Sequence, residues 1–117
     1  EYVEECRRHK FVSVDIEVWG YTEHGMGEIA CVGLGYRTDQ AICIPLVKTG
    51  GTPYWSLEDE IKIWRAFASL LQDPDVQLIG QNLAFDWIYF WFHRIFPCNL
   101  YIDTMTLHTV SIPTLVL

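Results

Sequence analysis

The sequence has few basic residues: 8 Lys and Arg stand against 15 Asp and Glu, and the formal net charge is −7. A protein that binds nucleic acid by itself is usually basic, because contacts with phosphate supply most of its affinity. The charge therefore argues against nucleic-acid binding by this chain alone. The objection weakens if bound divalent metals contact the phosphate, or if a larger parent chain supplies a basic surface.

The sequence also lacks long apolar segments and paired cysteines. Its most apolar segment, residues 83–96, is too short to span a membrane and contains Asp86, His93 and Arg94. The four cysteines form no C-x-x-C pair, no Cys and His have the spacing of a zinc site, and no signal peptide is recognisable. We therefore expect a cytoplasmic protein that has no membrane partner.

The first half of the chain has the pattern of strands. Half of the 117 residues are apolar and 15% are aromatic, which suits one domain over residues 1–117. After a helix end at 1–8, apolar and polar residues alternate over 11–18, as in a half-buried strand. Two further strands are expected at 28–36 and 40–46, joined by a loop short enough for a hairpin.

Helical patterns dominate the second half. Ser56 is a suitable N-cap for a helix whose apolar residues recur at helical spacing up to Leu71. We then expect a strand at 76–80, a helix at 84–96, a strand at 99–102 and, capped by Asp103, a helix from Thr104. The helix at 84–96 is apolar on nearly every side. Its aromatic residues are therefore expected to form core, not to stack on bases, and to pack against a further part of the parent protein.

The order of these elements predicts the fold class. Three consecutive strands joined by short loops should be antiparallel, and strands reached through helices should add in parallel. We predict an α/β domain with a mixed sheet flanked by helices. This order resembles the ribonuclease H-like fold.

The first candidate site is Asp15-Ile16-Glu17. Residues two apart on a strand share a face and lie roughly 6–7 Å apart. Two neighbouring carboxylates repel each other unless a cation lies between them, and Mg²⁺ or Mn²⁺ prefers such oxygen ligands. The alternative is an amphipathic strand whose two carboxylates are only solvated.

The second candidate site is the segment 80–86, Gly-Gln-Asn-Leu-Ala-Phe-Asp. Asn82 follows a strand, and Asp86 lies in the first turn of the next helix. Ligands of α/β sheets bind in the crevice beyond the carboxyl ends of the strands. The alternative for Asp86 is a structural one, since a carboxylate at a helix start also complements the helix dipole.

Together, these two segments resemble the first and second exonuclease motifs of the DEDD exonuclease family. Residues 102–105, Ile-Asp-Thr-Met, also resemble the strand-to-helix junction of proofreading domains in family A DNA polymerases, especially those of phages. The resemblance covers residues 2–110. It implies a bacterial protein or a phage protein in its host.

The resemblance also implies a role for each matching residue. Two divalent ions, Mg or Mn, would be held: Asp15 would bridge both, Glu17 would ligate the ion that carries the attacking water, and Asp86 would ligate the other. Asn82 would hold the substrate backbone. The implied reaction releases nucleoside 5′-monophosphates one at a time from a 3′ end.

The sequence departs from the family pattern in two places. Val18 occupies a substrate-binding position where family members often carry Thr or Ser. The third motif, a fourth carboxylate with a Tyr or His general base four or five residues before it, is absent. Asp103 comes too early and is interpreted as a helix cap, and His108 as an ordinary helical residue. We therefore expect a C-terminally truncated domain that is weak or inactive alone.

Three functions are consistent with these residues. The first is a proofreading exonuclease that acts on single-stranded DNA 3′ ends beside a polymerase domain of the same parent chain. The second is a ribonuclease D-like exonuclease acting on RNA 3′ ends with the same metal site. The third is a non-catalytic binding or structural remnant of the fold, against which the joint presence of Asp15, Glu17 and Asp86 argues.

Overall fold

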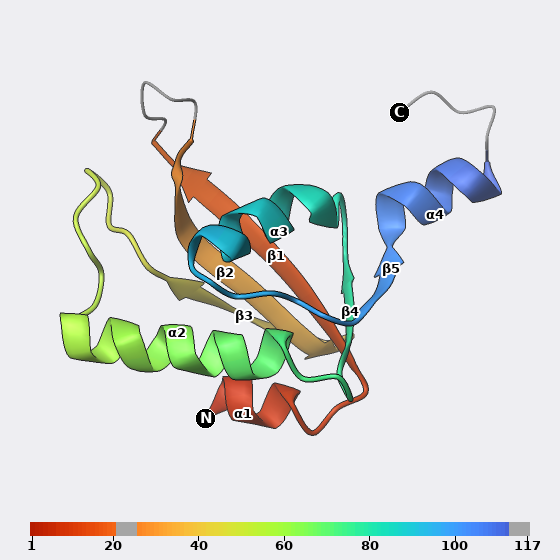
Figure 1. The fold of residues 1–117 in the computed structure, drawn as a ribbon, viewed down its shortest axis with the longest axis horizontal. Helices are drawn as coiled ribbons and strands as arrows, with labels where there is room; N and C mark the ends of the chain where they lie inside the picture. The colour runs from red at the N-terminus through yellow and green to blue at the C-terminus, as the bar shows by residue number, and fades with distance from the viewer. Residues whose placement is uncertain (21–25, 113–117) are drawn as a thin grey trace.

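Five strands form one mixed sheet in the order β3-β2-β1-β4-β5 (Figure 1). The structure is a computed structural model that describes residues 1–20 and 26–112. Strand β1 pairs antiparallel with β2, β2 pairs antiparallel with β3, and β1, β4 and β5 run parallel. The predicted fold class is therefore confirmed. The strands are β1 Phe11–Trp19, β2 Glu28–Arg37, β3 Gln40–Pro45, β4 Gln77–Gly80 and β5 Leu100–Asp103.

The helices α1, α2 and α3 cover one face of this sheet, and α4 lies beyond β5 at its edge (Figure 1). The core lies between that face and the covering helices. The alternate residues Val12, Val14 and Ile16 of β1 are all buried in this core. Among the described residues, no helix has the length and hydrophobicity needed to cross a membrane. The helices are α1 Tyr2–Cys6, α2 Leu57–Leu71, α3 Leu83–Phe92 and α4 Thr104–Ser111.

Helix α3 ends four residues earlier than its apolar pattern predicts. Arg94 adopts a left-handed backbone with φ 60°. The amide of Arg94 donates to the Trp91 carbonyl, and the amide of Ile95 donates to the Phe90 carbonyl. These two bonds form a Schellman motif, and Ile95 and Phe90 are both buried, as that motif favours. The prediction of helix up to residue 96 was wrong because a side chain other than glycine adopts the left-handed turn.

Strand β1 is much longer than its parallel neighbour. It pairs with β4 only through Phe11, Val12 and Ser13. Beyond Ser13, β4 no longer pairs with β1, and the uncovered edge of β1 faces the start of α3. The carboxyl half of β1 therefore borders a crevice of the kind in which α/β sheets bind ligands.

Candidate active site

Asp15 and Glu17 lie on the open face of the sheet. Their neighbours Val14 and Ile16 are buried on the opposite face, so the alternation of β1 brings both carboxylates to the side that the helices leave uncovered. Directly across from Asp15 on β2 is Gly33, which has no side chain to cover it. The two carboxylates predicted from the sequence are therefore neighbours on one accessible surface.

A cavity of about 400 Å³ adjoins Asp15. It extends from β1 across β2 in one direction and to the carboxyl end of β4 in the other. The polar residues of its lining come from three segments far apart in the sequence, namely β1, the end of β4 and the start of α4. Its lining includes Ser13, Asp15, Gly33, Gly80, Gln81 and Thr104.

Asp86 reaches the same strand from the first turn of α3. Of the charged residues that the structure describes, it is the buried one, with 3% of its surface exposed. Burial, and then the charge of Asp15, raise its pKa from 3.8 to about 7. Its Oδ2 has no hydrogen-bond partner within the described residues. A buried carboxylate oxygen without a partner is costly, and it marks a position where a cation would be stabilising.

The side chain of Asn82 does not cap the helix that follows it. It lies at the N-cap of α3 in the left-handed region, with φ 52° and ψ 48°, and its side chain makes no capping hydrogen bond. A residue held in this region is often part of a functional site. The Asn82 side chain is exposed beside the crevice, where a substrate contact is predicted.

The N-terminus of α3 is instead capped by Asp103, from the end of β5. The Asp103 carboxylate accepts hydrogen bonds from the backbone amides of Asn82 and Leu83, each at 2.9 Å. It also accepts from Met105 at 3.0 Å and from Thr106, at the start of α4. Burial raises its pKa, but these backbone donors outweigh that effect and lower the pKa below 3.8. The predicted cap of the last helix is confirmed, and Asp103 caps a second helix as well.

The remaining predicted residues lie differently. Val18 belongs to the core face of β1 and packs against the buried cluster, so its side chain points away from Glu17. Its assignment as a substrate contact stays a prediction. His108 lies on α4, and its Nε2 is buried without a partner among the described residues.

The donor atoms suit Mg²⁺ or Mn²⁺ in kind, since they are carboxylate oxygens and one of them has no partner. Their present arrangement is incomplete. In residues 1–20 and 26–112, no three His, Cys, Asp or Glu side chains are grouped closely enough to hold one ion. The fold thus brings Asp15 and Asp86 together without forming a closed ligand set.

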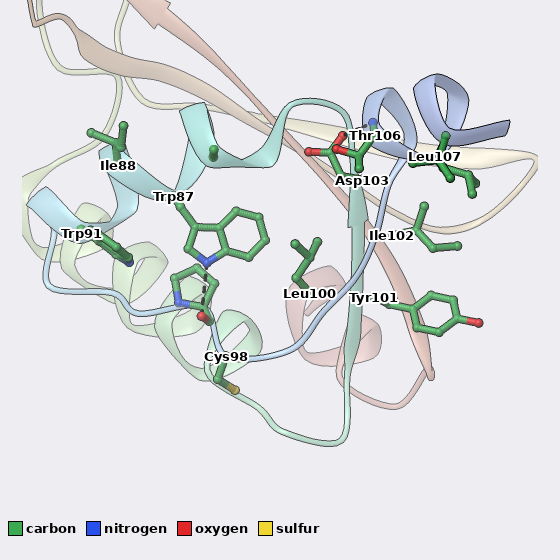
Figure 2. A pocket seen from close by; sticks show the side chains of 13 residues that line it. Trp87, Ile88, Trp91, Cys98, Leu100, Tyr101, Ile102, Asp103, Thr106 and Leu107 are labelled. Atoms are coloured by element: carbon green, nitrogen blue, oxygen red, sulfur yellow. Dashed lines mark hydrogen bonds between the residues drawn. The ribbon is translucent and has the colours of Figure 1, made fainter. Parts of the chain in front are cut away.

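The aromatic residues of α3 divide between core and surface. Tyr89 and Phe90 are buried, as predicted for core residues, whereas Trp91 is 54% exposed. Trp91 and the neighbouring Ile88 line an apolar groove of about 850 Å³ between α3, β5 and α4 (Figure 2). Trp87 lies within it and donates its indole N–H to the Pro97 carbonyl at 3.2 Å.

Comparison with solved structures shows where this fold occurs elsewhere. A comparison with protein-family models gives no match, and a comparison with curated proteins gives none either. Escherichia coli RNase D, an exoribonuclease involved in structured RNA processing, is 18% identical with a TM-score of 0.60, over 88% of this chain and 24% of that one. Brucella melitensis NrnC with bound Mg²⁺ is 14% identical with a TM-score of 0.64, over 95% and 49%. NrnC also has a structure bound to pGG.

The EXO domain of Aedes aegypti Nibbler is 16% identical with a TM-score of 0.62, over 97% of this chain and 52% of that domain. This chain thus spans between about a quarter and a half of the length of the three proteins. At such identities the likeness shows the fold alone. The mixed sheet predicted from the sequence recurs in these three solved structures.

Proposed function

We propose that this chain is a domain of a divalent-metal-dependent 3′→5′ exonuclease, with Asp15, Glu17 and Asp86 as its metal ligands. The observation that carries the proposal is the buried, unpartnered Oδ2 of Asp86 beside Asp15. A structural remnant of the fold would gain stability by replacing this aspartate, so its retention favours a working site. The fold is consistent, since RNase D is an exoribonuclease and NrnC binds Mg²⁺.

In this proposal, each residue acts according to its position. Two bound ions would supply a hydroxide near neutral pH and stabilise the leaving 3′ oxygen. Asp15 is exposed on the open sheet surface and near enough for its charge to raise the pKa of Asp86, which suits a ligand shared between two ions. Glu17 is exposed two residues further along the same face, where water could reach an ion bound to it. Asn82 would hold the substrate backbone at the end of β4, and its side chain is not used to cap α3.

The substrate is proposed to be a single-stranded 3′ end. DNA proofreading rests on the sequence resemblance to polymerase domains, and a polymerase partner is part of that proposal. Cleavage of RNA 3′ ends is favoured by the likeness to RNase D. Comparing the affinities for DNA and RNA oligonucleotides of one sequence distinguishes the two. We expect slow or no cleavage by these 117 residues alone, because no fourth carboxylate with its Tyr or His base is recognisable in the sequence.

Binding of Mn²⁺, followed by electron paramagnetic resonance, tests the metal site without requiring turnover. We expect wild-type protein to bind Mn²⁺ and the Asp15→Ala, Asp86→Ala double variant to lose that binding. The matched control is Asp39→Ala, Asp75→Ala, which removes two carboxylates from exposed positions outside the crevice. Equal binding by all three proteins, or none by the wild type, would contradict the proposed ligand set.

A further inference from the structure

Trp19 is a large aromatic residue exposed beside the candidate metal ligands. It ends β1 two residues after Glu17, and the alternation of the strand places it on the same open face as Asp15 and Glu17. The distance along the strand from Glu17 is roughly 6–7 Å, about the spacing between neighbouring nucleotides in an extended strand. Trp19 is 46% exposed. An indole this close to a proposed metal ligand would be within reach of a base near the 3′ end.

A tight turn over residues 48–52 supports the Trp19 indole. The amide of Lys48 donates to the Thr52 carbonyl at 2.8 Å, and that of Gly51 donates to the Lys48 carbonyl at 2.9 Å. Gly51 has φ +88°, and a Cβ added there would lie 3.2 Å from the indole Nε1 of Trp19. The backbone of the turn therefore lies against the indole edge. Glycine suits this position because of its left-handed backbone and the closeness of the ring, so the turn supports one edge of the indole.

The same turn supplies a positive charge. Lys48 belongs to it, and its Nζ lies 5.9 Å from the centre of the exposed Tyr54 ring. A chain of net charge −7 must attract phosphate locally if it binds nucleic acid at all. Among the described residues, Trp19 thus ends an acidic strand and lies against a polar turn that contains Lys48. Trp91, by contrast, is exposed within an apolar groove.

We propose that Trp19 and the turn at residues 48–52 form a nucleobase subsite, in which the indole stacks on a base within two nucleotides of the 3′ end and Lys48 contacts the phosphate of that nucleotide. The proposal rests on the proposed exonuclease function. Stacking on an aromatic ring is independent of base identity, as an enzyme that removes successive nucleotides requires. An indole supported along one edge presents its face before the substrate arrives.

Binding of a short single-stranded oligonucleotide carrying 2-aminopurine at either of its last two positions tests the subsite. Stacking on Trp19 should quench the fluorescence of 2-aminopurine in one of these two probes. With Ca²⁺ present, we expect Trp19→Ala to weaken binding about 5- to 100-fold. Trp19→Phe should retain most of the affinity. Trp91→Ala, which removes an exposed tryptophan outside the site, should bind like the wild type.

A second probe with abasic residues at both terminal positions isolates the stacking contribution. Trp19→Ala should bind this probe as the wild type does. If Trp19→Ala destabilises the fold, Trp19→Leu replaces it, since leucine retains apolar bulk without an aromatic face. Lys48→Gln should reduce the dependence of affinity on salt concentration, whereas Lys62→Gln on α2 should not.

Two results would overturn the subsite. In one, the wild type binds the oligonucleotide and both non-aromatic variants bind equally well. In the other, they lose the same affinity for the abasic probe as for the intact one. Failure of the wild type to bind any single-stranded probe would instead reject the exonuclease proposal together with this one, so the two failures are distinguishable.

Discussion

Replacing Asp86 by Asn should stabilise the metal-free protein at neutral and alkaline pH. The unfolded chain loses its Asp86 proton near pH 4, whereas the folded protein keeps it until about pH 7. The folded state therefore binds more protons between these values, so its stability falls as pH rises through this window and stays lower above it. A tenfold change in proton affinity is worth about 1.4 kcal/mol, so a pKa of about 7 instead of 3.8 corresponds to about 4 kcal/mol.

This energy is large for a domain whose total stability is expected to be about 5–15 kcal/mol. Asn retains the shape of Asp and cannot ionise, so Asp86→Asn avoids the cost. We expect a gain approaching about 4 kcal/mol at pH 8, or on the order of 10–15 °C in melting temperature, and little gain at pH 4. The gain should shrink in Mn²⁺, because the ion stabilises only the wild type.

Urea unfolding followed by circular dichroism at pH 4, 6 and 8, with a chelator present, measures this difference. Asp75→Asn is the matched control, since it removes one carboxylate from an exposed position outside the site. An Asp86→Asn variant that is less stable than the wild type at pH 8, or whose advantage does not grow with pH, would refute the reasoning. It would mean that the Asp86 carboxylate is well solvated or paired in the folded protein.

Two further substitutions test how the crevice is built. Asp103→Ala should destabilise the protein by about 2–4 kcal/mol, because two helices lose their caps. The difference from the wild type should shrink as pH falls through the lowered pKa of Asp103, since the ionised carboxylate contributes its full stability above the pKa of the unfolded chain and loses it below its own folded pKa. Gly80→Ala should cost about 1–3 kcal/mol, because an added Cβ would lie 2.9 Å from the Val14 carbonyl. Thermal unfolding checks both, and wild-type stability in either variant would contradict the packing described.

Much of this architecture could be predicted from the sequence because its patterns are local. The alternation of β1 predicted the face of Asp15 and Glu17, and Ser56 predicted the start of α2, where its side chain accepts from the Asp59 amide at 3.2 Å. The left-handed turn at Arg94 was not predictable in this way. Its driving force is the burial of Ile95 against the core, a contact made by tertiary structure.

The second role of Asp103 was likewise hidden, because the amides it caps lie 20 and 21 residues earlier in the sequence. Only the register of parallel strands, in which Gly80 pairs with Asp103, brings them together. A prediction could have found the contact by asking which residue ends the strand beside β4. That step requires the strand order, which local patterns do not give.

Asp103 therefore positions the site although it is not one of the predicted ligands. Its carboxylate joins the first amides of α3 to those of α4, and the Thr104 hydroxyl donates to the Gly80 carbonyl at 3.2 Å. These bonds fix the point at which the chain leaves β4. Since Asp86 lies less than one turn into α3, its approach to β1 depends on that point. The carboxylate that caps both helix starts thus helps to position a second, buried carboxylate, whose Oδ2 has no partner among the described residues.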